Sequence, residues 1–116
     1  MEFPPNPSWE ITQEKVEAAI KKIIEVGKPK KIILFGSYVK DRIHINSDVD
    51  FMVIASNEIE NPRRESVRLR RALRGISMPM DIIVVPEQVW RQLKKQPGMI
   101  YREAAREGRI VYESST

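Results

Sequence analysis

The acidic residues Asp48 and Asp50 are separated only by Val49, at the start of an apolar segment. Side chains two residues apart in a strand point to the same face, which would place both carboxylates side by side with Cα atoms roughly 6–7 Å apart. Like charges on one face repel each other unless a cation lies between them. Hard carboxylate oxygens at this spacing suit Mg²⁺ or Mn²⁺. A turn at Ser47-Asp48 followed by a solvated edge residue is the alternative interpretation.

A third carboxylate, Asp81, lies in the apolar run Met80–Val85. A buried, unpaired carboxylate in such a strand is costly, so Asp81 needs a cation, a hydrogen-bond donor or solvent. If its strand lies beside the strand of Asp48 and Asp50, three carboxylates meet at one end of the sheet. They would then form a two-metal site for in-line phosphoryl chemistry. A strand-entry residue near solvent is the alternative interpretation of Asp81.

The dipeptide Gly36-Ser37 directly follows the short apolar segment Lys31–Phe35. Glycine lets the backbone turn sharply and approach a ligand closely. If a helix begins at Ser37, its free N–H groups and the serine hydroxyl form an anion site. The dipeptide alone is more typical of a plain turn than of an anion site, but its combination with the three carboxylates is far more specific.

Local patterns predict helices and strands that alternate along the chain. Apolar residues at helical spacing indicate a first helix that begins near Ser8 or Thr12, with Gly27 as the first residue beyond its end. The expected fold class is α/β (α+β), a small mixed β-sheet with helices packed on it. The other expected elements are strands at Lys31–Phe35, Val49–Ala55 and Met80–Val85, a helix opened by Asn61-Pro62, helices at Glu87–Gln96 and Met99–Glu107, and a short extended tail at Ile110–Tyr112.

Size and composition limit the possible classes of protein. The chain has 116 residues and a formal net charge of +4, which indicates one domain over residues 1–116 with a Pro-rich lead at 1–7. The longest apolar runs are four residues, so we expect no membrane span. The absence of Cys excludes disulfides and Cys-ligated zinc, and a single His leaves carboxylates as the metal ligands. Without a visible signal peptide, a cytoplasmic protein is expected.

Six arginines fall within the segment from Arg63 to Arg74, opposed only by Glu65. Charge of this density suggests an anionic partner. A solvated helix face whose arginines cover apolar surface is one interpretation. Among the functional interpretations, we favour a docking surface for a partner protein over a phosphate-binding wall. Nucleic-acid binding is possible but less favoured, because no aromatic residue interleaves the arginines to stack bases. The predicted partner-binding residues are Arg63, Arg64, Arg68 and Arg71.

The spacing of these motifs resembles a known signature. Gly36-Ser37, ten further residues, Asp48-Val49-Asp50 and a later Asp81 resemble the pattern of the DNA polymerase β-like nucleotidyltransferase superfamily. The tail over residues 101–112 looks like its minimal nucleotidyltransferase branch. The resemblance implies a nucleotidyltransferase-like fold in which Asp48 and Asp50 are Mg²⁺ ligands. Asp81 would be the third catalytic carboxylate, completing the metal site and assisting deprotonation of the acceptor hydroxyl.

The resemblance also implies a substrate and a partner. Gly36 and Ser37 would hold the phosphates of ATP or another nucleoside triphosphate, and Lys40 and Arg42 are the cations available in the same loop. Many minimal nucleotidyltransferases pair with HEPN (higher eukaryote and prokaryote nucleotide-binding) toxins and, as antitoxins, adenylylate a toxin tyrosine. Because the domain is small, little of the chain is left to form an acceptor pocket. A HEPN-type partner or a homo-oligomer is therefore expected to complete the site.

Two other functions stay open. Family members often carry a small residue where this chain has Asp41. With its loop altered at Asp41, the same fold would serve as a binding module that neutralises a toxin by contact through the Arg63–Arg74 face. A nucleic-acid-binding protein that uses this basic face is the third possibility.

Overall fold

The computed structural model describes residues 10–39 and 48–115. The Pro-rich lead and the predicted phosphate cations Lys40 and Arg42 lie outside the described residues, as does Asp41. No helix in the described part of the chain is long and apolar enough to cross a membrane. The elements are α1 (Gln13–Gly27), β1 (Lys31–Phe35), β2 (Val49–Ala55), α2 (Pro62–Ala72), β3 (Met80–Pro86), α3 (Glu87–Leu93), α4 (Ile100–Glu107) and β4 (Arg109–Glu113).

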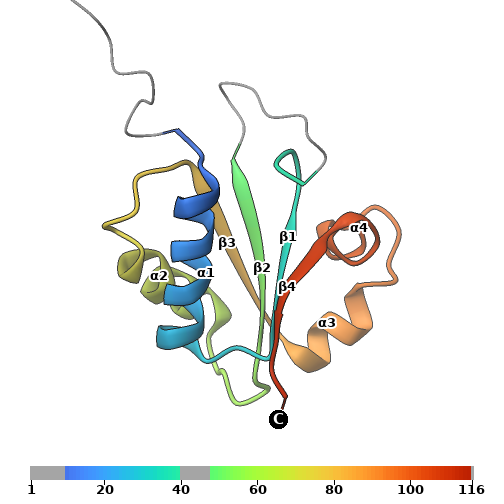
Figure 1. Cartoon of the computed structure of the whole chain (residues 1–116). Coiled ribbons are helices and arrows are strands. Elements are labelled where there is room, and N and C mark those ends of the chain that lie inside the picture. The colour runs from blue at the N-terminus through green and yellow to red at the C-terminus, as the bar shows by residue number, and fades with distance from the viewer. Residues whose placement is uncertain (1–9, 40–47, 116) are drawn as a thin grey trace, which may run out of the picture.

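The four strands form one mixed sheet in the order β3-β2-β1-β4. Strands β2 and β3 are parallel, whereas β1 is antiparallel to both β2 and β4. Figure 1 shows α1 and α2 on one side of the sheet and α3 and α4 on the other. Each side encloses a core of buried apolar residues, so the predicted mixed sheet with helices packed on it is confirmed.

Helix α1 begins where the sequence supplies a cap. The Thr12 hydroxyl accepts a hydrogen bond from the Lys15 backbone N–H at 3.1 Å. At the other end, Gly27 is still helical and Lys28 adopts the left-handed conformation, with a φ of 46°. The expectation that Gly27 would be the residue after the helix is therefore wrong. A Cβ at Gly27 would lie 3.0 Å from Leu69 of α2, so this glycine permits close packing of α1 and α2.

Helix α2 carries most of the arginine-rich segment. The Asn61 side chain caps it by accepting the Arg64 backbone N–H at 3.1 Å, and Pro62 occupies the first turn. Leu69 is buried against the sheet, and Leu73 is buried just beyond the helix. Apolar burial on one side leaves the arginines on the solvent side, as expected for an amphipathic helix.

Helix α4 lies directly on β1 because Gly108 follows it. A Cβ at Gly108 would overlap the Ala104 carbonyl oxygen and the Ile33 side chain. Strand β4 then pairs antiparallel with the outer edge of β1. The predicted extended tail is thus a strand of the sheet, and α4 is held over the centre of the sheet near the start of β2.

Candidate active site

Asp50 and Asp81 lie side by side on two parallel strands. They are direct register partners, in a pairing that runs from Val49–Met80 to Ala55–Pro86. Because Met52 and Ile54 pack in the core beneath α3 and α4, alternation places Asp50 on that same face. The condition on which the predicted carboxylate cluster depended, that these two strands be neighbours, is met.

The turn after β1 meets the carboxylates at the same end of the sheet. Phe35 is the register partner of Asp50, so Gly36 follows directly beside it. Gly36 has a φ of +84°, and a Cβ there would overlap the Asp50 carboxylate. Residues 36–39 form a turn, and no helix begins at Ser37 within those residues. The glycine is therefore required both by the backbone conformation and by the proximity of Asp50.

Asp48 lies in solvent immediately before β2. The next residue, Val49, donates its backbone N–H to the Pro79 carbonyl at 3.0 Å, which ties the start of β2 to the start of β3. Asp50 is half-buried, and its pKa is raised to about 6, first by burial and then by the charges of Asp81, Asp48 and Glu103. The predicted carboxylates thus share one electrostatic environment in which ionisation of Asp50 is unfavourable.

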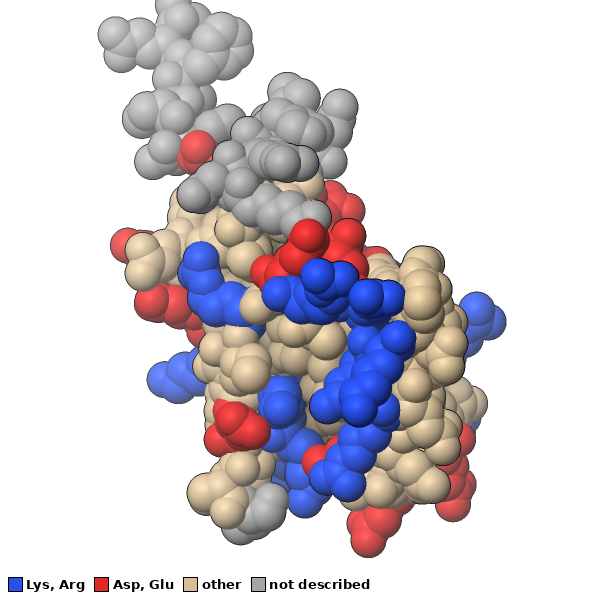
Figure 2. Space-filling model, turned by 90° about the vertical axis from the view of Figure 1, so that its right-hand side faces the viewer, with Lys and Arg blue, Asp and Glu red and all other residues tan. Residues whose placement is uncertain are grey.

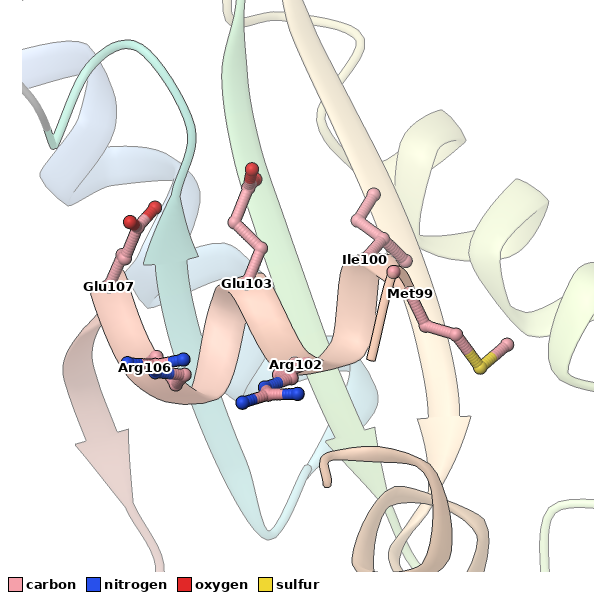
Figure 3. Close-up of a pocket in the computed structure, with 7 residues that line it drawn as sticks. Met99, Ile100, Arg102, Glu103, Arg106 and Glu107 are labelled. Carbon is pink, nitrogen blue, oxygen red and sulfur yellow. The ribbon is translucent and has the colours of Figure 1, made fainter. Parts of the chain in front are cut away.

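Glu103 of α4 joins this environment, although no sequence motif pointed to it. Figure 3 shows Glu103 and Glu107 on one side of α4, and Arg102 and Arg106 on the other. These residues line a surface hollow of about 610 Å³ with Met99 and Ile100 near the start of the helix. Glu103 is far from the Asp-x-Asp motif in sequence, and only the packing of α4 onto the sheet brings it close.

Asp81 has partners on two sides. Its Oδ1 atom accepts a hydrogen bond from Arg70 Nη2 at 2.8 Å and another from the Ile82 backbone N–H at 3.0 Å. The Asp81 side chain is also 49% exposed. Asp81 therefore has all three of the partners that the sequence suggested: a cation in Arg70, a hydrogen-bond donor in the Ile82 N–H, and solvent. Arg70 belongs to the arginine-rich segment but was not among the predicted site residues.

Comparison with known proteins identifies the family. The family described as Polymerase beta, Nucleotidyltransferase matches residues 17–116 of this chain. The chain belongs to this nucleotidyltransferase family. A Methanocaldococcus jannaschii protein with the provisional name of a protein adenylyltransferase is 28% identical to this nucleotidyltransferase over 102 residues, covering 83% of this chain and 97% of the relative.

Two solved structures share the fold of this nucleotidyltransferase. A chain of a toxin–antitoxin crystal structure with AMP-PNP superposes with a TM-score of 0.55 and 23% identity, over 90% of this chain and 76% of the other. A chain of the toxin–antitoxin MntA–HpeT, in a substituted form, gives a TM-score of 0.59 and 18% identity, over 91% and 76%. Identities this low support the fold alone.

The donor chemistry of the nucleotidyltransferase site suits a hard divalent cation. Carboxylate oxygens are the ligands that Mg²⁺ and Mn²⁺ prefer, and a cation would offset both the burial and the carboxylate repulsion that raise the pKa of Asp50. Within residues 10–39 and 48–115, no three acidic or histidine side chains are already gathered closely enough to hold a metal. Asp81 Oδ1 is taken by Arg70 in this conformation.

Basic side chains gather on the face of the nucleotidyltransferase that carries α3 and α4. Figure 2 shows a blue band of Lys and Arg on the side where α3 and α4 lie, directly below a red acidic cluster. The hollows on this side are lined by Arg102 and Arg106 of α4 and by Arg91 of α3. No sequence motif pointed to these three arginines, because they are spread over two helices.

The predicted partner-binding arginines of α2 differ in what they contact. Arg63, Arg64 and Arg71 are exposed. Arg68 instead binds both oxygens of Glu65 at 2.8 Å and donates to the Val26 carbonyl at 3.0 Å. Arg68 therefore links α2 to the end of α1, a side-chain hydrogen bond that the other three do not make with any residue of the described ranges.

Proposed function

We propose that this nucleotidyltransferase transfers AMP from ATP to a tyrosine hydroxyl of a HEPN-type toxin and thereby acts as its antitoxin. The observation that carries the proposal is the convergence of Gly36, Asp50 and Asp81 at one end of the sheet, beside Asp48. The adenylyltransferase name of the archaeal relative supports the reaction. The toxin–antitoxin neighbours, one with AMP-PNP, support the partner and the nucleotide.

Each carboxylate has a proposed role. Asp48 and Asp50 would hold Mg²⁺ or Mn²⁺, and Asp81 would complete the catalytic set. When bound, the metal would neutralise the triphosphate and polarise its α-phosphorus. The acceptor oxygen forms a bond to the α-phosphorus while the bond to the bridging oxygen of the β-phosphate breaks, and pyrophosphate leaves. The hydroxyl proton passes to Asp81, as the third carboxylate beside the acceptor.

The turn at Gly36-Ser37 is the proposed cradle for the phosphates. With no side chain at Gly36, backbone and ligand approach each other closely, and the Ser37 hydroxyl is available as a donor. Lys40 and Arg42 are the proposed cations of the same loop. Catalysis of this kind depends on positioning and charge stabilisation rather than on covalent chemistry by the protein.

The arginines of α2 are the proposed docking surface for the toxin. Arg63, Arg64 and Arg71 are exposed and would contact an acidic surface of the partner, with Arg68 contributing at the edge of the same face. The band on α3 and α4 carries the same sign of charge beside the carboxylates. An acidic partner is therefore attracted to both flanks of the site.

One experiment tests the function directly. The protein is incubated with Mg²⁺, its toxin and ATP labelled at the α-phosphate, and label on the toxin is measured. We expect transfer by the wild type, none by Asp48→Ala or Asp50→Ala, and wild-type transfer by Glu60→Ala, an exposed acid in the loop after β2. Full transfer by either aspartate variant rejects the site. Tight toxin binding without transfer by the wild type favours the non-catalytic binding module.

A further inference from the structure

Among the ion pairs of the described residues, a single one links the arginine-rich helix α2 to the carboxylates of the site. Arg70 Nη2 lies 2.8 Å from Asp81 Oδ1. The two side chains are 57% and 49% exposed, so both are free to exchange partners with solvent. Helix α2 packs against β3, which explains why an arginine of this helix reaches the carboxylate.

The hydrogen bonds of Asp81 leave little room for a metal ion. Oδ1 accepts both Arg70 Nη2 and the Ile82 backbone N–H, which uses the two lone pairs of that oxygen. A cation bound through Oδ1 must displace the guanidinium. A cation bound through Oδ2 would lie beside a positive charge held by the same carboxylate. Either geometry sets Arg70 and a divalent cation in competition for Asp81.

We propose that Arg70 binds Asp81 in the metal-free protein and is displaced from it when a metal–nucleotide complex binds. The freed guanidinium then pairs with the triphosphate. This inference rests on the proposed function, since it requires Asp81 to be a metal ligand. It follows that metal alone binds weakly, whereas the nucleotide offsets the loss of the ion pair by giving Arg70 a new anionic partner.

The neighbouring arginines of the segment do not share this arrangement. Arg68 is turned toward Glu65 and the Val26 carbonyl. Arg74 lies four residues after Arg70, in the turn that follows α2, is exposed, and forms no ion pair within the described ranges. Arg74→Gln therefore removes the same charge from the same segment without touching Asp81, and serves as the matched control for Arg70→Gln.

The test is a Mn²⁺ titration followed by the electron paramagnetic resonance signal of the free ion. Without nucleotide, Arg70→Gln should bind Mn²⁺ about two- to fivefold more tightly than the wild type, as expected from loss of an exposed ion pair. Arg74→Gln should change the affinity by less than about half of that factor. With a non-hydrolysable ATP analogue present, the advantage of Arg70→Gln should disappear, because the nucleotide also loses its contact with Arg70.

Further variants separate competition at Asp81 from a general effect of charge. In an Asp81→Asn background, Arg70→Gln should alter Mn²⁺ affinity no more than Arg74→Gln does. Equal affinities of Arg70→Gln and Arg74→Gln, or an Arg70→Gln effect that persists in Asp81→Asn, would overturn the inference. Circular dichroism and thermal unfolding confirm that each variant is folded.

Failure of this inference is distinguishable from failure of the proposed function. If the wild type binds no Mn²⁺ and transfers no AMP, the proposed function itself is rejected. If the wild type transfers AMP while Arg70→Gln and Arg74→Gln bind Mn²⁺ equally, only the role of Arg70 is rejected.

Discussion

Gly36 and Asp50 face each other across β1 and β2 so closely that a single Cβ on Gly36 would overlap the Asp50 carboxylate. The glycine also has a φ of +84°, a region that other residues rarely adopt. The site therefore depends on the absence of a side chain at this position. Two other glycines of the chain separate the contributions of backbone conformation and steric overlap.

Gly36→Ala should lower the free energy of unfolding by about 3 kcal/mol, from backbone strain and overlap together. Gly98 also has a positive φ, but a Cβ there meets no atom within 4 Å, so Gly98→Ala should cost only about 1 kcal/mol. Gly75 has neither feature, and Gly75→Ala should change stability by less than about 0.5 kcal/mol. Urea unfolding measures all three. Equal costs at Gly36 and Gly98 would contradict the overlap.

Stability should depend on pH through Asp50, whose pKa is raised to about 6 from an ordinary value of 3.8. The folded protein holds the proton of the Asp50 carboxyl more tightly than the unfolded chain does. The resulting contribution to the free energy of unfolding is therefore fully present below about pH 4 and is lost as pH rises through about 6. The Asp50→Asn variant has no ionisable side chain at this position, so its stability does not fall in this way as pH rises. Relative to the wild type, the free energy of unfolding of Asp50→Asn should therefore rise by about 1 kcal/mol from about pH 4.5 to about pH 7.5, allowing for partial solvent screening.

Urea unfolding of the wild type and Asp50→Asn across this pH range measures the difference. Added Mg²⁺ should stabilise the wild type at about pH 7.5 and have little effect on Asp50→Asn, since binding to the folded state alone raises stability. A constant difference between the two proteins at every pH would contradict the electrostatic account.

Charge reversal should distinguish the two basic surfaces. If the toxin docks on α2, Arg63→Glu with Arg64→Glu should slow association about tenfold or more at low salt, whereas Arg102→Glu with Arg106→Glu on α4 should have a smaller effect. Stopped-flow association at two salt concentrations measures both rates. A larger loss from the α4 pair would move the docking surface to the band on α3 and α4.

Gly108→Ala should destabilise the protein by about 2 kcal/mol, because a Cβ there overlaps the Ala104 carbonyl oxygen and the Ile33 side chain. The helix α4 must then lift from β1 and carry Glu103 away from Asp50. We therefore expect a second effect, a lower pKa of Asp50 in the variant, since one of the charges that raise it has moved. NMR titration of the Asp50 carboxyl carbon measures this shift. An unchanged pKa would mean that α4 keeps its place.

The strands were predictable because their local signals agree. Lys31–Phe35 and Val49–Ala55 have the predicted bounds, and the third strand extends one residue further, to Pro86. Each is a β-branched apolar run bounded by glycine, proline or polar residues. The pattern placed Asp50 and Asp81 at the start of two strands, but whether these strands are neighbours was left as a condition that the parallel pairing of β2 and β3 meets.

The helix ends and the outer residues of the site were less predictable. Helix α3 ends at Leu93 rather than Gln96, because the chain turns ahead of Pro97. The proximity of Arg70 and Glu103 to the carboxylates depends on the rotation of α2 and the docking of α4. Both are charged residues on exposed helix faces. There the sequence pattern predicts only that a side chain is exposed to solvent, and it does not indicate a partner far away in the chain.

The pairing of the last strand with the first has a consequence for biosynthesis. Strand β1 leaves the ribosome early, but its outer edge stays open until β4 follows at the far end of the described chain. Prematurely terminated products would carry Gly36, Asp50 and Asp81 yet expose a strand edge prone to aggregation. Only a chain that extends through β4 closes this edge of the sheet, so the four-stranded sheet is complete only after translation has passed Glu113.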